Sequence, residues 1–216
     1  MSGVPTGEQI PRTRTHDWSS AVDRKHLALV RERAADLAPG GLGHLVLEVL
    51  AYPADEAAAT GRGSCVVTFL ADGSVRVTDD GRGTEVAVVG DGTIVRKPVM
   101  SSADVRFFDS PSPPRLPDGF GRRGISVVAA LSAWLVHTNR RADGAWTQRY
   151  EYGVPVTGLV EVPRDGTTGT TVHLMPAPVA GAGDAVVADV GRWSQAWPQL
   201  TVRIDDARGV TAPGSR

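Results

Sequence analysis

Two adjacent carboxylates stand in a glycine-containing turn in the first half of the chain. Residues 77–83 read Val-Thr-Asp-Asp-Gly-Arg-Gly, so two residues that favour β-strands lead directly into Asp79 and Asp80. Gly81 and Gly83 allow a turn that other residues make less freely, and they let a planar ligand approach the backbone closely. An aspartate in the place of Asp79, at a strand end beside such a turn, can accept a hydrogen bond from the amino group of an adenine. The alternative is a turn in which both aspartates only bind nearby amides, and such turns are common.

A second acid lies upstream, within an apolar helical pattern. Residues 42–50 place leucines and valines on one helical face, and Glu48 shares the other face with Tyr52 and Asp55. A carboxylate held on a helix beside a ligand is a reasonable general base. His44 lies four residues before Glu48, where it could orient that carboxylate; a histidine bonded only to backbone groups is the alternative. The two acids predict a pocket between a helix and a strand end.

Composition limits the classes of protein to which the chain could belong. Its 216 residues, 41% of them hydrophobic, suit one domain with a full core. The formal net charge of −1 includes no basic excess, so direct binding of DNA is not expected. No apolar run approaches the roughly 18 residues of a membrane span, and the N-terminus has no apolar signal-peptide core. A single cysteine, Cys65, excludes an internal disulfide, and a cytoplasmic location is expected.

The elements that position these residues alternate irregularly between helices and hairpins. Helices are predicted after residue 17, from Leu42, over residues 125–135 and over residues 184–197. The predicted strands are residues 65–70, 74–78, 146–152, 157–162, 170–174 and 201–204. This mixture favours a two-layer α+β sandwich over a doubly wound parallel sheet.

The order of the motifs along the chain resembles a known domain. Residues 45–50, 55–57, 77–83, 124–132, 150–155 and 168–170 follow one another as in the ATP-binding domain of DNA gyrase B, a member of the GHKL group. The resemblance implies the GHKL (Bergerat) ATP-binding sandwich, with a mixed, mainly antiparallel sheet covered on one face by helices. We expect this domain over residues 17–205, with a flexible arm at 1–16 and a flexible tail at 206–216.

The resemblance also implies roles for single residues. Glu48 matches the glutamate that activates the hydrolytic water, with His44 as its partner. Asp79 matches the aspartate that binds adenine, and Thr170 matches the threonine that supports it. Gly83, after Gly81 in the turn, matches the glycine beneath the base. The implied cofactor is ATP, and the glycines of the phosphate-binding lid correspond to Gly119, Gly121 and Gly124.

The phosphate end departs from the family pattern. The family holds Mg²⁺ through an asparagine whose place is taken here by Tyr52, and a phenol is a poor magnesium ligand. Pro53 follows, and a proline inside a helix removes a hydrogen bond at a cost of roughly 3 kcal/mol, so we expect a kink or break there. No metal-binding residue is predicted, and the participation of Mg²⁺ is left open.

The lid departs as well. The family pattern is roughly Gly-Leu-His-Gly-Val-Gly, whereas residues 119–124 read Gly-Phe-Gly-Arg-Arg-Gly. Arg122 and Arg123 could bind phosphates without a metal, and solvated loop arginines are the alternative. The same residues spell a dinucleotide-binding Gly-x-Gly-x-x-Gly, but that motif needs a preceding strand, which the prolines of residues 110–117 exclude.

The leading hypothesis is a stand-alone gyrase-B-like ATP-binding protein. It would keep the adenine end, hydrolyse ATP weakly or not at all with Mg²⁺, and lack topoisomerase activity alone. One alternative is an enzyme that reuses the pocket for a non-nucleotide small molecule, with His44, Glu48, Tyr52 and Arg122 as its acid–base set. Another is a gyrase-related regulatory or drug-binding module. An adenine nucleotide or other small molecule is the expected partner, homodimerisation is left open, and neither DNA nor a membrane is expected to bind.

Overall fold

The computed structural model describes residues 22–84, 87–88, 94–95, 100–180, 183 and 185–209. The arm expected at residues 1–16 lies outside these residues, as does most of the expected tail. The domain bounds therefore stay a prediction. Within the described residues, no helix is both long enough and apolar enough to cross a membrane.

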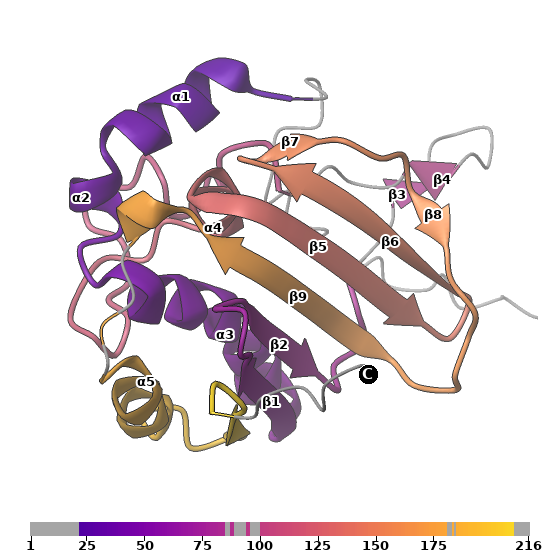
Figure 1. The fold of residues 1–216 in the computed structure, drawn as a ribbon. Helices are drawn as coiled ribbons and strands as arrows, with labels where there is room; N and C mark the ends of the chain where they lie inside the picture. The colour runs from indigo at the N-terminus through magenta and orange to yellow at the C-terminus, as the bar shows by residue number, and fades with distance from the viewer. Residues whose placement is uncertain are drawn as a thin grey trace, which may run out of the picture.

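One large sheet forms the centre of the fold (Figure 1). Its strands run in the order β10-β1-β2-β9-β5-β6-β7, and β8 pairs separately with β6. All of these pairs are antiparallel except β1 with β10. The bounds are β1 (Gly63–Phe69), β2 (Val75–Asp79), β5 (Ser132–Arg141), β6 (Gly144–Glu151), β7 (Val154–Pro155), β8 (Val160–Glu161), β9 (Gly169–Pro176) and β10 (Leu200–Asp206). Two short strands, β3 (Ala87–Val88) and β4 (Ile94–Val95), pair with each other.

The helices gather on one side of this sheet (Figure 1). Their bounds are α1 (Arg24–Glu32), α2 (Ala34–Leu37), α3 (Gly41–Thr60), α4 (Ile125–Ala130), the 3-10 turn η1 (Pro178–Ala180) and α5 (Val186–Ser194). The long α3 packs against β1, β2 and α5, and α4 packs against β5. Strands present alternate residues to these helices, as Cys65, Val67 and Phe69 do on β1. The mixed, mainly antiparallel sheet with helices on one face confirms the predicted α+β sandwich.

The apolar segment at residues 125–135 differs from its prediction. The helix α4 ends at Ala130, and β5 begins at Ser132 and runs to Arg141. From Leu135 onward, buried and half-buried residues alternate, with His137 and Asn139 also buried. A short apolar run has no periodicity that separates a buried helix from a buried strand, so the prediction extended the helix over the start of the strand. The strand predicted at residues 157–162 is also shorter, since only β8 lies within it.

The break expected at Pro53 does not occur. The helix α3 is a single element of 20 residues that contains this proline. Leu50 and Ala51 before it, and Ala54 and Ala57 after it, are all buried. Because both sides of the proline are packed in the core, tertiary contacts outweigh the lost hydrogen bond. The helix therefore carries side chains at a constant spacing along the whole length of the site.

Candidate functional site

Asp79 ends β2 and is held by β9. Its Oδ1 accepts hydrogen bonds from the backbone N–H of Gly81 at 2.9 Å and of Thr170 at 3.1 Å. Its Oδ2 accepts a hydrogen bond from the Thr170 hydroxyl. Burial raises the pKa of Asp79, and the hydrogen bonds from Thr170 and Gly81 oppose this shift. The structure thus brings together the aspartate and the threonine that the sequence analysis paired, from segments 91 residues apart.

Gly83 lies where no larger residue fits. Its φ is +78°, and a Cβ there would stand 2.5 Å from Asn139 Oδ1 and 2.6 Å from the Arg140 carbonyl. Asn139 was not predicted as a site residue; its side chain accepts from the Thr84 N–H at 2.8 Å and donates to the Thr84 carbonyl at 3.0 Å. These bonds fix the chain that leaves the turn against β5, and a single asparagine in a strand offers no sequence signal for such a contact.

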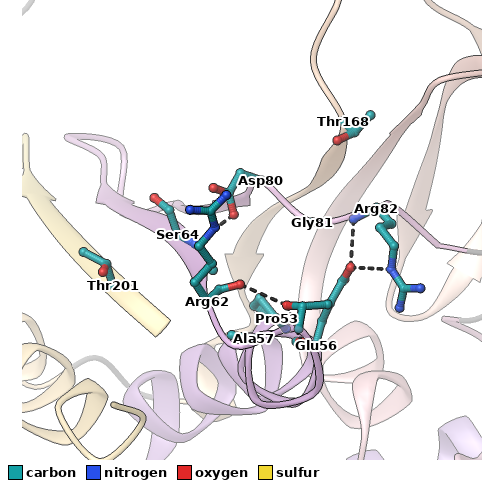
Figure 2. A pocket seen from close by; sticks show the side chains of 12 residues that line it. Pro53, Glu56, Ala57, Arg62, Ser64, Asp80, Gly81, Arg82, Thr168 and Thr201 are labelled. Carbon is teal, nitrogen blue, oxygen red and sulfur yellow. Dashed lines mark hydrogen bonds and ion pairs between the residues drawn. The ribbon is translucent and has the colours of Figure 1, made fainter. Parts of the chain in front are cut away.

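An open cavity of about 480 Å³ lies beside this turn (Figure 2). It is lined by Pro53, Glu56, Ala57, Thr60, Arg62, Gly63, Ser64, Asp80, Gly81, Arg82, Thr168 and Thr201. Of the predicted site residues only Gly81 lines it, so the cavity lies on the Asp80 side of the turn. Glu56 joins α3 to the turn, since its Oε1 accepts from Arg82 N at 3.0 Å and from Arg82 Nε at 2.8 Å. Sequence reasoning did not assign this clamp.

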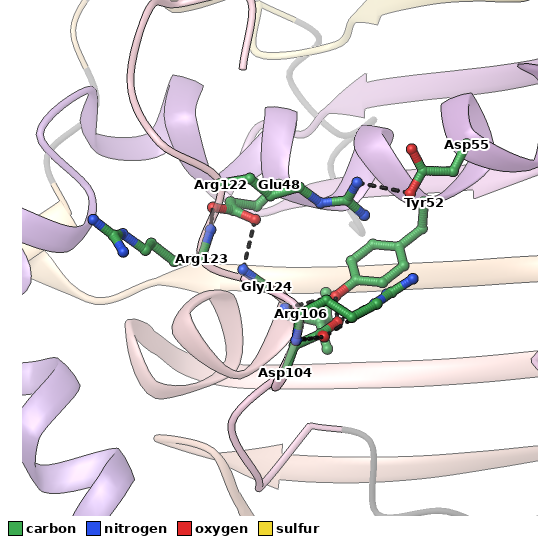
Figure 3. Close-up of polar contacts among 9 residues, drawn as sticks. Glu48, Tyr52, Asp55, Asp104, Arg106, Arg122, Arg123 and Gly124 are labelled. Atoms are coloured by element: carbon green, nitrogen blue, oxygen red, sulfur yellow. Dashed lines mark hydrogen bonds and ion pairs between the residues drawn. The ribbon is translucent and has the colours of Figure 1, made fainter. Parts of the chain in front are cut away.

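Glu48 lies at the other end of the site and is fully buried. Its Oε1 accepts a hydrogen bond from the Arg123 N–H at 2.5 Å, and its Oε2 accepts one from the Gly124 N–H at 2.9 Å (Figure 3). A carboxylate in this state is enclosed by the protein and does not contact open solvent. Glu48 lies on the helix face that the sequence predicted, but the loop that carries Arg123 and Gly124 packs over it.

His44 is buried between two carboxylates. Its Nδ1 lies 2.6 Å from Asp118 Oδ2, and its Nε2 lies 3.5 Å from Glu48 Oε1. Burial acts to lower the pKa of His44, but the hydrogen bond to Asp118 and the nearby carboxylates of Glu48 and Asp118 raise the pKa to about 9. His44 is therefore an imidazolium at neutral pH. Asp118 was missed from the sequence, because it follows the proline-rich segment and no spacing links it to His44.

Tyr52 closes the side of the site next to Glu48. Its hydroxyl accepts a hydrogen bond from the Ile125 N–H and donates one to Asp104 Oδ2, both at 3.1 Å. Burial and the nearby Asp104 carboxylate raise the pKa of the Tyr52 phenol, so it stays neutral and keeps its proton. Asp104 also forms an ion pair with Arg106 at 2.9 Å. Neither Asp104 nor Arg106 was predicted to take part.

Arg122 is only 4% exposed, so it is not a solvated loop arginine. Its Nη1 donates to Asp55 Oδ2 at 2.7 Å, and its guanidinium carbon lies 4.6 Å from the ring centre of Tyr52 and 4.1 Å from that of Phe107. Among the described residues, Nε and Nη2 of Arg122 have no hydrogen-bond partner. Its neighbour Arg123 donates from Nη1 to the Phe108 carbonyl at 3.2 Å.

The predicted glycine lid is a loop folded on itself. Arg115 pairs with Gly121 as an isolated bridge, and Arg115 Nη1 donates to the Gly119 carbonyl at 2.6 Å. A Cβ at Gly121 would stand 2.7 Å from Pro113 Cγ, so the proline-rich segment packs directly on the loop. A Cβ added at Gly119 would meet nothing within 4 Å. Of the three glycines, only Gly124 contacts a predicted catalytic residue.

The residues around Tyr52 do not fit a magnesium ion. In the described part of the chain, no three His, Cys, Asp or Glu side chains are grouped to hold a metal. Two guanidinium groups, of Arg106 and Arg122, already lie within 6 Å of the Tyr52 ring centre. Mg²⁺ takes carboxylate, amide or phosphate oxygens, and a second cation here would meet these fixed positive charges.

The mixed, mainly antiparallel sheet and the long helix α3 beside the strand end that bears Asp79 place the chain in the α+β class and are compatible with the GHKL sandwich. The amino-acid sequence is also similar to those of known proteins. The chain is 34% identical over 181 residues to the novobiocin-sensitive DNA gyrase B of Streptomyces niveus, and the match covers 81% of this chain and 26% of that protein. It is 38% identical over 134 residues to DNA gyrase B of Streptomyces coelicolor, covering 61% of this chain and 19% of that protein.

DNA topoisomerase 4 B of Staphylococcus epidermidis is 33% identical over 138 residues, covering 63% of this chain and 21% of that protein. The chain is thus a homologue of the DNA gyrase B and topoisomerase 4 B proteins. It spans about a quarter or less of the length of these relatives. No protein-family model matches the chain.

Proposed function

We propose that this chain is a gyrase-B-like ATP-binding domain that keeps the adenine end of its pocket and hydrolyses ATP weakly or not at all. The observation that carries the proposal is the contrast between the two carboxylates. Asp79 is held in place beside an open turn, whereas both oxygens of Glu48 are bonded inside the protein. The Asp79 carboxylate can therefore still accept a hydrogen bond from a ligand, whereas the Glu48 carboxylate is already bonded through both of its oxygens.

The adenine end supports recognition of a base. Three donors from Gly81 and Thr170 fix the Asp79 carboxylate, and a carboxylate has about four lone-pair positions. One position therefore remains for the amino group of an adenine. The clamp between Glu56 and Arg82 holds the turn that follows Asp79 in place.

The other end supports weak hydrolysis at most. A general base must come within hydrogen-bond reach of the water that it activates. Glu48 has no such reach in this conformation, because its side chain is buried and both oxygens accept backbone N–H groups. The guanidinium groups near Tyr52 further disfavour a magnesium ion.

Calorimetry with ATP and a non-hydrolysable analogue, with and without Mg²⁺, tests the proposal. We expect binding that changes little with Mg²⁺, and ATP turnover near background that Glu48→Ala does not lower. Asp79→Asn is expected to weaken adenine-nucleotide binding by about tenfold or more, since a lost charge-assisted hydrogen bond is worth at least ~1.4 kcal/mol. Turnover that Glu48→Ala abolishes would contradict the hydrolysis part. Unchanged affinity in Asp79→Asn would contradict the adenine assignment.

A drug-binding role is the second candidate. It is favoured by the relative from Streptomyces niveus, whose name includes sensitivity to novobiocin. A thermal-shift titration with novobiocin tests this role, and stabilisation by the drug without any response to ATP would favour it. An enzyme that uses His44, Glu48, Tyr52 and Arg122 on another substrate is less supported, because none of the four lines the described cavity.

A further inference from the structure

One face of α3 contacts a later segment of the same chain, which buries His44 and Glu48 fully and leaves Asp55 at the end of the row exposed. His44, Glu48, Tyr52 and Asp55 follow at intervals of four, four and three residues, which places them on one side of the helix. Each of them bonds to the segment formed by residues 104–125, which we call the covering segment. Figure 3 shows these contacts for Glu48, Tyr52 and Asp55. In the described structure, the covering segment thus occupies the polar groups of this row.

The contacts use the groups that an anion would need. The backbone N–H groups of Arg123 and Gly124 donate to Glu48, and the N–H of Ile125 donates to the Tyr52 hydroxyl. The guanidinium of Arg122 is paired with Asp55. Backbone amides and arginine side chains are the usual protein groups that bind phosphate. Here carboxylates of α3 already occupy them, so Glu48 and Asp55 act as internal anions.

The helix α3 connects the covered face to the turn that follows Asp79. Glu56 holds the turn after Asp79, and it follows Glu48 by eight residues, or about 12 Å along α3 at 1.5 Å per residue. A nucleotide whose base contacts Asp79 and whose phosphates extend along α3 therefore reaches the covered face. A nucleoside has no group that must reach it.

We propose that the α3 carboxylates of Glu48 and Asp55 compete with the triphosphate of an adenine nucleotide for the backbone amides and the arginine of the covering segment. An adenosine-like ligand at the Asp79 end then leaves the segment docked on α3, whereas ATP binds only to molecules in which the segment has been released from α3. The proposal rests on the proposed function, since it takes the Asp79 end as the site of the base. The segment acts as a regulator of the same pocket, and any partner that withdraws it increases ATP binding.

Competition of this kind has a defined thermodynamic form. The apparent dissociation constant of ATP equals its intrinsic value divided by the fraction of molecules with the segment released. A substitution that weakens the contacts raises this fraction, and it tightens ATP binding until the released form dominates. The affinity for adenosine does not depend on this fraction, so the ratio of the two affinities measures the competition.

Titration of adenosine and ATP into the full chain tests the competition. We expect adenosine to bind about tenfold or more tightly than ATP, which corresponds to a mostly docked segment. Asp118→Asn and Asp104→Asn each weaken a contact to α3 and are expected to tighten ATP binding about threefold or more, with adenosine affinity unchanged within about twofold. Asp109→Asn changes an exposed aspartate of the same segment and is the matched control, for which neither affinity should change.

Amide hydrogen exchange on the unmodified chain gives a second measurement that needs no variant. ATP should increase exchange over residues 104–122, and adenosine should not. ATP that binds at least as tightly as adenosine, with no change in exchange, would overturn the competition while leaving the proposed function standing. Failure of every adenine ligand to bind would instead overturn the proposed function, and this inference with it.

Discussion

The charge state of His44 depends on both of its carboxylate neighbours. Asp118 and Glu48 lie on opposite sides of the imidazole and raise its pKa from 6.5 to about 9, against the effect of burial. His137 has the opposite shift, since burial lowers its pKa to about 4. The two histidines therefore act on stability in different pH ranges.

Stability should fall between about pH 6.5 and 9 because of His44. A folded-state pKa above the unfolded value gives stability that is complete below about pH 6.5 and is lost as the pH rises through about 9. The size is up to about 3 kcal/mol, at 1.36 kcal/mol per unit of pKa. Urea unfolding from pH 6 to 9 measures this fall, and His44→Gln should flatten it. The lowered pKa of His137 acts between about pH 4 and 6.5, where stability rises with pH, and His44→Gln should leave that range unchanged.

Gly169 sets the distance between β9 and the end of β2. Its φ is +122°, and a Cβ there would stand 2.1 Å from the Asp79 carbonyl oxygen. Gly169→Ala should lower the free energy of unfolding by more than about 3 kcal/mol, because backbone atoms would have to separate. Gly166→Ala is the control, since its φ is +81° and nothing lies within 4 Å of the added carbon. That control should cost only about 1–2 kcal/mol in urea unfolding, and equal losses for both glycines would contradict the steric argument.

At the scale of elements, α3 retains a proline that its own backbone does not favour. Pro53→Ala restores an N–H donor opposite the Val49 carbonyl without removing core packing, since Pro53 is half-buried and lines the cavity. We expect the free energy of unfolding to rise by about 1–3 kcal/mol, less the entropy that proline removes from the unfolded chain. Thermal unfolding measures this change. A lower melting temperature in Pro53→Ala would show that the ring itself packs in a way that alanine cannot replace.

Elements with strong periodicity could be predicted from the sequence, and the covering segment could not. The apolar periodicity of α3 before Pro53 and the turn between β1 and β2 are set by residues close together in the chain, so the sequence predicts both elements well. The start of β5 was hidden within an apolar run whose helix and strand forms look alike. The contacts of Asp104 and Asp118 join α3 over 52 and 74 residues, and no local spacing encodes such contacts.

The candidate site shows the same limit. Asp79 and Thr170 were paired through the resemblance, and the structure brings them together by the pairing of β2 with β9. Glu48 was placed on the correct face of α3, but its enclosure by the amides of Arg123 and Gly124 follows from tertiary packing alone. The sequence therefore predicts where a charged side chain lies along a helix or strand. It does not predict which distant segment packs over that side chain.

At the scale of the whole molecule, the sheet is completed by its last strand. β10 pairs in parallel with β1 over seven residues, and Leu200 at its start is buried. A chain that ends after residue 199 should therefore expose the edge of β1 and unfold or aggregate. A chain that ends after residue 209 keeps every described contact of β10 and is the control. Circular dichroism and light scattering compare the two, and a folded, monomeric shorter chain would contradict this role of β10.

The strand order also has a consequence for synthesis on the ribosome. In the sheet, the β1–β2 hairpin lies between β9 and β10, and both of these strands come much later in the chain. Thr170, which bonds to Asp79, follows it by 91 residues. Contacts between such distant residues form slowly, because a long loop must close before they gain any stabilisation. The nascent hairpin therefore has two unpaired edges until β9 and β10 have left the ribosome, and the contact between Asp79 and Thr170 forms only then.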